Sequence, residues 1–234
     1  MAALLIVLAT LLSYAVGWAI GIPILLPILN TLASFPFMVL ALRRGDLRLA
    51  VARMLIWALT MGVVATLGSY RWPAQTGALF LRGETYRAEM FTWVATGQGA
   101  ESNPSQFIPQ QIGHAALFSG LALATGGAAA MPMGAVLMNY MGHYVGTLAE
   151  TSAQPALTLL LAWHPWAVVR VISFVVIGVV FSAPLLSRIL KFPVEWNAAR
   201  PFLVWAGVGL VLDVLLKTLL APTWQRLLLR SVGW

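Results

Sequence analysis

Three long stretches without a charged residue constrain this chain more than any other feature. Residues 1–42, 102–149 and 151–169 contain no Asp, Glu, Lys or Arg. A helix that spans a bilayer needs about 20 mostly apolar residues, so these stretches are long enough for several crossings. Only helices and closed barrels satisfy their backbone groups in lipid, and the alternating pattern of a barrel strand is missing. The sequence therefore predicts an all-α fold, a polytopic transmembrane helical bundle.

The composition supports this prediction and argues against a soluble protein. Of the 234 residues, 60% are hydrophobic and 9% are charged, whereas soluble domains have about 45–50% and about 25%. The net charge of +7 comes from basic residues between the apolar stretches, where they bind lipid headgroups and set orientation. We therefore expect membrane lipids as partners and no nucleic acid. The chain has no cysteine, which excludes disulfides and thiolate metal sites.

We expect one integral membrane domain over residues 1–234 with six or seven spanning helices. Gly21, Pro23 and Pro27 interrupt the first stretch, and proline breaks or kinks a helix. Residues 3–42 could therefore cross twice or form one broken helix. The predicted spans are residues 3–20, 24–42, 54–70, 112–130, 133–149, 167–187 and 202–222.

Residues 71–111 are the only predicted extramembrane segment of any size. Its three arginines balance its three glutamates, which is typical of a non-cytoplasmic loop. Tyr86, Met90, Trp93 and Val94 recur at helical spacing and predict a short amphipathic helix on the membrane surface or over the bundle.

The basic residues predict the orientation and the cell membrane. Basic residues dominate residues 43–53 and 188–200, so the positive-inside rule places both loops and the N-terminus in the cytoplasm. The chain fits a bacterial cytoplasmic (inner) membrane. Seven spans would put the C-terminal tail outside, with Arg226 and Arg230 anchored at lipid headgroups. We expect similar anchoring at the interface from Trp166 and Arg170.

Residues 112–149 form a predicted hairpin with small residues on both arms. Ala116, Gly120 and Ala124 lie on the first arm, and Gly142 and Gly146 lie on the second. Such spacing lets helix backbones approach closely in lipid. We expect this hairpin at the centre of the bundle.

Asp213 and Lys217 are the first candidates for function. Ionisable residues inside a membrane are costly and are functional candidates by default. Asp213 falls near the middle of the predicted span 202–222, and Lys217 follows four residues later on the same face. The pair could relay protons or ions, or it could form a structural ion pair within one helix.

His114, His143, Asn139, Tyr140 and Asn30 are further candidates for binding a ligand or cofactor. The two histidines lie at similar heights on the hairpin and could meet, as a haem or quinone site would require. A metal site would need additional ligands, so none is predicted, and no cofactor is strongly implied. The polar side chains of Asn139, Tyr140 and Asn30 need a partner in lipid, which a substrate or a neighbouring helix could supply.

Three functions fit these features. The preferred hypothesis is a non-catalytic subunit of a larger membrane assembly, with other membrane subunits as partners. The second is a permease for a small solute or ion, or the membrane component of a transporter, that uses Asp213 and Lys217. The third is a haem- or quinone-linked redox subunit. Since the sequence contains no nucleotide-binding glycine loop, no HExxH and no GxSxG, an enzyme is less favoured.

Overall fold

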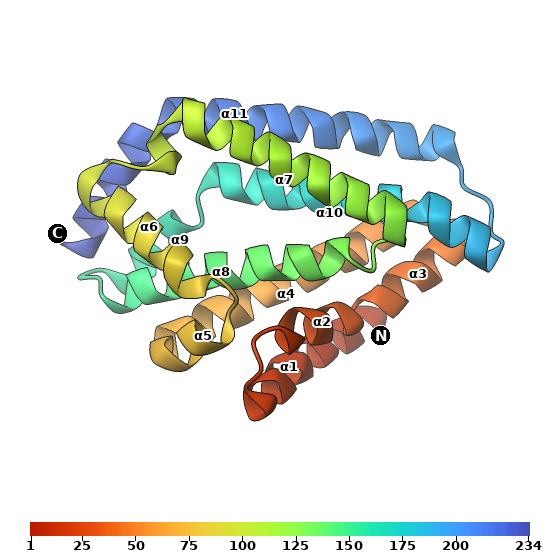
Figure 1. Ribbon diagram of the computed structural model, residues 1–234, viewed down its shortest axis with the longest axis horizontal. Coiled ribbons are helices and arrows are strands. Elements are labelled where there is room, and N and C mark those ends of the chain that lie inside the picture. Colours follow the sequence, from red (N-terminus) through yellow and green to blue (C-terminus); the bar gives the residue numbers. More distant parts are fainter.

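The protein consists entirely of helices and their connections (Figure 1). The computed structural model describes all residues 1–234 and contains no strand. The predicted all-α fold is therefore confirmed. The elements are α1 (Ala2–Ile20), α2 (Leu25–Leu32), α3 (Phe35–Arg43), α4 (Leu47–Arg71), α5 (Pro73–Leu79), α6 (Gly83–Thr96), η1 (Ala100–Ser102), α7 (Pro104–Thr125), α8 (Ala130–Glu150), α9 (Pro155–Ala162), α10 (Pro165–Leu190) and α11 (Trp196–Val232).

Five segments are long and apolar enough to cross a membrane. They are α1, the continuous pair α2–α3, α4, α10 and α11. Large apolar side chains on their outer faces are exposed, including Leu59, Val211 and Leu219, and lipid can solvate such faces. These features mark the chain as a membrane protein. The helices α7 and α8 run beside these segments (Figure 1) and carry more polar side chains, several of which face inward.

The first two apolar segments form an antiparallel hairpin. Gly21 adopts a left-handed conformation (φ 71°) that ends α1, and the chain then reverses into α2. Ser13 accepts a hydrogen bond from the Asn30 amide at 2.8 Å, and Gly17 lies against Leu26. As the residue number rises from 13 to 17 in α1, the number of the partner residue falls from 30 to 26 in α2. This is the pattern of antiparallel helices. Residues 3–42 therefore form two antiparallel segments and not one broken helix. The second segment consists of α2 and α3, which are separated by a short turn.

Several helices are longer than the apolar stretches from which they were predicted. Helix α4 begins at Leu47 because Asp46 caps it, accepting a hydrogen bond from the Leu49 amide at 2.8 Å. Helix α7 begins at Pro104 after the cap Asn103, and not at residue 112. Helix α11 runs for 37 residues to Val232, about 55 Å at the usual rise. Hydropathy marks the part of a helix in lipid, whereas caps mark its ends.

The predicted loop, residues 71–111, is mostly helical. It contains α5, α6, η1 and the first turns of α7. The predicted amphipathic helix is present as α6, and Met90, Trp93 and Val94 are buried beneath it. The turn of the α7–α8 hairpin lies at residues 126–129, earlier than expected, because Gly126 and Gly127 adopt left-handed conformations there.

The small residues of this hairpin do not pack its two arms together. Gly142 and Gly146 face α4: a Cβ on Gly142 would lie 2.5 Å from the Cβ of Ala65, and one on Gly146 would lie 2.3 Å from the carbonyl oxygen of Thr66. On α7, by contrast, a Cβ on Gly120 would meet nothing within 4 Å. Helix α8 therefore packs closely on α4, while α7 packs against α10, and the two arms diverge (Figure 1).

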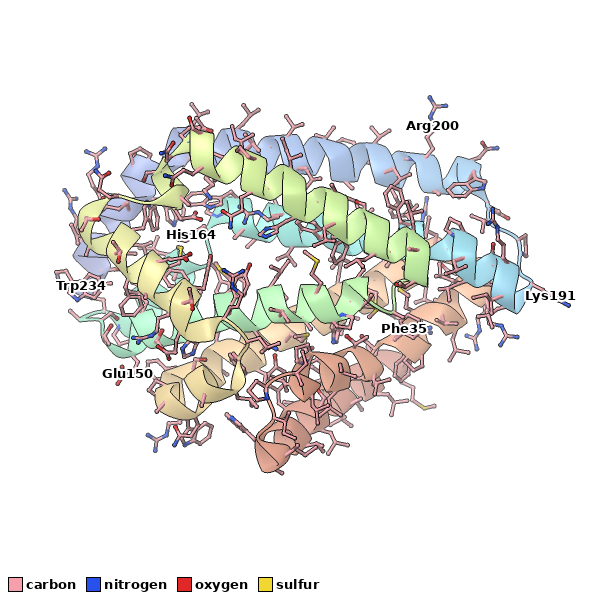
Figure 2. The ribbon with its side chains drawn as sticks, viewed as in Figure 1. Phe35, Glu150, His164, Lys191, Arg200 and Trp234 are labelled. Atoms are coloured by element: carbon pink, nitrogen blue, oxygen red, sulfur yellow. The ribbon has the colours of Figure 1, made fainter.

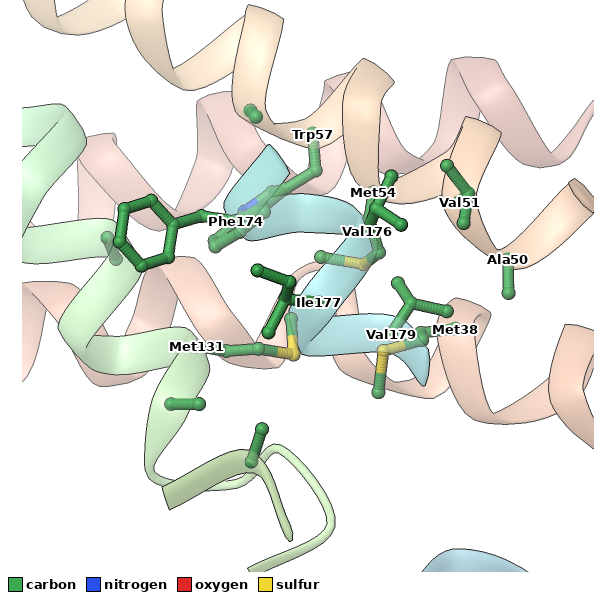
Figure 3. Close-up of a cluster of buried hydrophobic side chains, with 14 of the residues drawn as sticks. Met38, Ala50, Val51, Met54, Trp57, Met131, Phe174, Val176, Ile177 and Val179 are labelled. Carbon is green, nitrogen blue, oxygen red and sulfur yellow. The ribbon is translucent and has the colours of Figure 1, made fainter. Parts of the chain in front are cut away.

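The main apolar core lies between α3, α4, α8 and α10 (Figure 3). Met38 and Met131 approach Ile177 and Val179 of α10 there, and Trp57 closes the cluster from α4. The Trp57 indole donates a hydrogen bond to the Asn30 carbonyl at 2.9 Å, which satisfies a polar group that the core would otherwise leave unpaired.

The two ends of the bundle differ in charge. We call one the basic end; it contains the α3–α4 and α10–α11 connections, with Lys191 and Arg200 (Figure 2). The opposite end carries α6, η1 and the C-terminal residue Trp234, and we call it the capped end. Because α1 is antiparallel to α2–α3, the N-terminus points toward the basic end.

Candidate functional site

A cavity of about 1,020 Å³ lies between the diverging arms α7 and α8. Side chains from α3, α4, α6, η1, α7, α8, α10 and α11 line it. Figure 2 shows side chains of these helices extending into the space between them, with His164 at the capped end. Ligand sites usually have volumes of about 300–1,000 Å³, so the cavity can hold a large organic molecule.

The cavity lining changes from polar to apolar along α10. His164 and Arg170 line the cavity near the start of this helix, and Phe174 and Val179 line it further along. From His164 to Val179 the helical rise is about 22 Å. The cavity is therefore polar near the capped end and apolar near the core of Figure 3.

Helices α7 and α8 repeat this change of polarity. Helix α7 starts at the capped end. Its lining side chains there are Gln106, Gln110, Gln111 and His114 beside the ring of Phe107, and further along they are Leu117 and Phe118. Helix α8 runs the opposite way: its lining residues begin with Met131 and Met133, and its one polar lining residue, Tyr140, comes near the other end beside Met141. Three helices thus place their polar groups at the same end of the cavity.

Asp213 forms an ion pair with Arg170 at the polar end. The guanidinium donates two hydrogen bonds to the carboxylate, Nε to Oδ2 at 2.7 Å and Nη2 to Oδ1 at 3.0 Å. Gln111 also donates to Asp213, which is fully buried. Arg170 was expected at the lipid interface, but its charge is directed inward because Asp213 is its partner. This pairing also places Asp213 level with the first turns of α10, nearer the capped end than the midpoint predicted for it.

Lys217 forms a second ion pair with a residue of the cap. Its Nζ lies 2.8 Å from the Glu101 carboxylate and 4.3 Å from the centre of the Phe107 ring. Burial opposes ionisation of Glu101, but the nearby charges of Lys217 and Arg170 outweigh it and lower the pKa of the carboxyl. Asp213 and Lys217 thus do not pair within α11, and each joins that helix to a different element.

Aromatic rings complete the polar end of the cavity. His164 stacks on Trp166 with 4.6 Å between ring centres, and the rings of Tyr86 and Tyr140 are 4.4 Å apart. The Tyr86 hydroxyl has only the sulfur of Met141 as a partner, at 3.5 Å. Trp166, predicted to be an interface anchor, is only 1% exposed, because it packs between His164 and Trp224. Arg226 and Arg230 are exposed on the last turns of α11.

Three of the other predicted binding residues lie outside the cavity, in two polar clusters. His143 is hydrogen-bonded to Glu84 at 2.9 Å, Ser69 at 3.1 Å and Thr76 at 3.2 Å. Burial again opposes ionisation of Glu84, but hydrogen bonds from His143 and Arg87 outweigh it and lower its pKa.

Asn139 and Asn30 form a second polar cluster and have partners within the protein. The Asn139 amide donates to Asn30 at 3.2 Å, and its oxygen accepts a hydrogen bond from Tyr14. Neither residue lines the cavity.

His114 and His143 are therefore not brought together. His114 lines the cavity, whereas His143 faces α4, α5 and α6. A haem held by both imidazoles would require the two rings to converge. No group of three or more His, Asp or Glu residues is arranged to hold a metal ion.

Three residues at the polar end of the cavity were not among the predicted site residues: Glu101, Gln111 and His164. Glu101 and Gln111 lie in the predicted extramembrane segment 71–111, and His164 lies just before the predicted span 167–187. The charge count gave one available signal: Arg170 and Lys217 both lie in predicted spans, whereas Asp213 is the only acid in those two spans. Since buried charges require partners, another acid had to approach from outside the apolar stretches.

Comparison with known proteins adds no relative: no family model, no curated protein and no solved structure matches this chain.

Proposed function

We propose that this protein is a permease-type carrier that binds an amphiphilic solute inside the membrane. The observation that carries this proposal is the change from polar to apolar lining, repeated on α7, α8 and α10. A solute with a polar head and an apolar body would match both ends of such a cavity. A purely apolar ligand would not match the polar end of the cavity, and a small ion would not need the apolar end.

The elements over the polar end suit the gating that a carrier requires. Helix α6 and η1 are joined by residues 97–99, where Gly97 and Gly99 have positive φ values of 71° and 132°. The cap is held to α11 by Glu101 on Lys217 and by a hydrogen bond from Gln225 to the Val94 carbonyl at 2.6 Å. Carriers open and close short segments of this kind around a fixed site. Toward the basic end, the core of Figure 3 closes the cavity.

We further propose that the carrier lies in a bacterial inner membrane with its basic end in the cytoplasm. The positive-inside rule supports this orientation. The N-terminus would then be cytoplasmic, and residues 71–111 and the C-terminus would be outside. Solute would reach the polar end of the cavity from the outer side or from the outer leaflet.

The test is to fill the cavity without changing the surface. Gly134 lines the cavity, and a Cβ there would meet only Phe118, at 3.5 Å. Native mass spectrometry of purified Gly134→Leu should show loss of the amphiphiles that the wild-type protein retains from its host membrane. Gly120→Leu is the matched control, because it adds the same side chain outside the cavity. Equal retention by both variants and the wild type would contradict the proposal.

A subunit of a larger assembly is the second candidate. Ala116, Gly120 and Ala124 lie exposed along α7, and small residues let another membrane helix approach closely. This role predicts that gentle purification from native membranes yields a fixed mass larger than one chain. A single chain with bound amphiphile would favour the carrier alone.

A further inference from the structure

We infer that the solute carries an anionic head, a phosphate or carboxylate group, on a hydrocarbon chain. The inference rests on the proposed carrier function and specifies its substrate class. The head would lie among Arg82, Arg170, His114 and Tyr140, and the chain would extend along α10 toward the core of Figure 3.

Two guanidinium groups supply the positive charge. Arg170 uses Nε and Nη2 for Asp213, so its Nη1 remains available in the cavity that the residue lines. Arg82 also lines the cavity and forms no ion pair within the chain. It is held at the start of α6 in a left-handed conformation. Arginine binds phosphate and carboxylate through paired, charge-assisted hydrogen bonds.

Neutral donors surround these two arginines. His114 and Tyr140 line the cavity and form no hydrogen bond with the rest of the chain, and the Tyr86 hydroxyl has only a sulfur acceptor. A ring N–H and two phenol groups can all donate to an anion. All three side chains are half-buried and line the cavity, so the acceptor atoms of a ligand in the cavity could be their partners.

The acids of the cavity do not cancel this preference. Glu101 is occupied by Lys217 at 2.8 Å. Glu89 is unpaired and exposed on α6, where it could favour a cation instead. Of the charged side chains that line the cavity, three are basic (Arg82, Arg170 and Lys217) and two are acidic (Glu89 and Glu101). The charged groups of the lining therefore carry one more positive than negative charge.

The apolar end suits a flexible chain. Five methionines line it, from α3, α4 and α8: Met38, Met54, Met131, Met133 and Met138. Methionine side chains are unbranched and adapt to irregular shapes. Phe118 and Phe174 supply flat surfaces beside them, with 5.0 Å between their ring centres. A hydrocarbon chain would thus be enclosed without a fixed shape being imposed on it.

The experiment compares ligands with one chain and four heads. Binding of hexadecyl phosphate, palmitate, hexadecanol and hexadecyltrimethylammonium to the purified protein is measured by native mass spectrometry at equal concentrations. We expect the two anions to bind about tenfold more tightly than the alcohol and the cation. One charge-assisted hydrogen bond to the head lowers a dissociation constant by about this factor. The ratio between phosphate and palmitate then identifies which anionic head is preferred.

Two variants of α6 test the role of Arg82. Arg82→Gln should reduce the preference for anions about tenfold, and Arg82→Lys should retain part of it. Glu89→Gln is the matched control, since it removes the opposite charge from the same helix and cavity and should leave anion binding equal or tighter. Both positions are exposed, and a thermal melt of each variant confirms that it is folded.

The possible outcomes separate this inference from the proposed function. Tighter binding of the cation would overturn the inference of an anionic head and leave the carrier function intact. The same conclusion would follow if all four ligands bound equally and Gly134→Leu abolished that binding. If no ligand binds to the wild-type protein, both fail. Anion preference that Arg82→Gln reduces and Glu89→Gln does not reduce supports both.

Discussion

At the residue scale, two ion pairs at the polar end of the cavity place charge inside the bundle. Asp213 is fully buried, and Lys217 is 3% exposed. The cost of burying an ion is several kcal/mol, which a well-placed partner can offset. Removing one partner therefore costs more than removing both.

Asp213→Asn should destabilise the protein by about 3–5 kcal/mol, because Arg170 would remain without its carboxylate. The loss should appear as a lower melting temperature in detergent. The double variant Arg170→Gln with Asp213→Asn should lose less than the sum of the two single variants. Additive losses would show that the pair is not coupled.

Acid should weaken the attachment of the cap through Glu101. Its pKa in the folded protein is lowered from the ordinary value of 4.5, so its ionised form favours folding. That contribution is fully present above the ordinary pKa and disappears as the pH falls through the lowered value. The melting temperature should therefore fall on acidification below about 4.5, and it should fall less in Glu101→Gln. Glu150→Gln, at an exposed site without an ion pair, should behave like the wild type.

The sequence revealed one side of each ion pair. Asp213 and Lys217 stand out because they interrupt an apolar stretch. Their partners did not: Arg170 resembled an interface anchor, and Glu101 lies in a polar segment, GQGAESNP. Only the path of the chain, which returns η1 over α11, shows that Glu101 reaches Lys217.

At the scale of elements, the contact of α8 with α4 depends on two glycines. A Cβ on Gly146 would lie 2.3 Å from the Thr66 carbonyl oxygen and 2.7 Å from the Tyr70 nitrogen. These are backbone atoms, which cannot move aside without shifting α4. The close approach of the two helices therefore requires glycine at this position.

Gly146→Ala should destabilise the protein by about 1–3 kcal/mol, as overpacking usually does. Gly120→Ala, where a Cβ would meet nothing within 4 Å, should be neutral or stabilising by up to about 1 kcal/mol, because alanine favours helix. Thermal unfolding of both variants in the same detergent measures the difference. Equal effects would contradict the close α8–α4 contact.

The lengths of the apolar stretches predicted which segments are helices. They did not predict where each helix begins and ends or which helices pack together. The long apolar stretches predicted α1, α4, α10 and α11, and helical spacing predicted α6. Caps such as Asp46 and Asn103 lie outside the apolar stretches, so hydropathy placed the starts of α4 and α7 too late. The small residues of α7 and α8 indicated close packing but could not show that only α8 uses them.

At the scale of the whole molecule, the separation of charge between the two ends predicts an orientation. The chain has no cysteine, so single cysteines can be labelled without background. In intact cells, an impermeant maleimide should label Glu150→Cys at the capped end. Lys191→Cys, at the basic end (Figure 2), should react only after the membrane is permeabilised. The reverse pattern would contradict the proposed orientation.

The cavity could not be predicted from the sequence, because its lining comes from helices distant in the chain. Gln111 and His114 resemble ordinary polar interruptions of an apolar stretch, and Met131 and Met138 resemble core residues. Their common surface exists only because α7 packs on α10 while α8 packs on α4. The change in polarity becomes visible once these helices are placed side by side.

The most direct test of the account is photo-crosslinking with a palmitate analogue that carries a diazirine near the end of its chain. Peptide mass spectrometry should find the adduct on the apolar lining, at Met131 or Phe174. Excess palmitate should compete with it, Gly134→Leu should abolish it, and Gly120→Leu should not. Adducts confined to outward-facing residues such as Leu59 and Leu219, unaffected by competition, would show that the chain of the ligand does not enter the cavity.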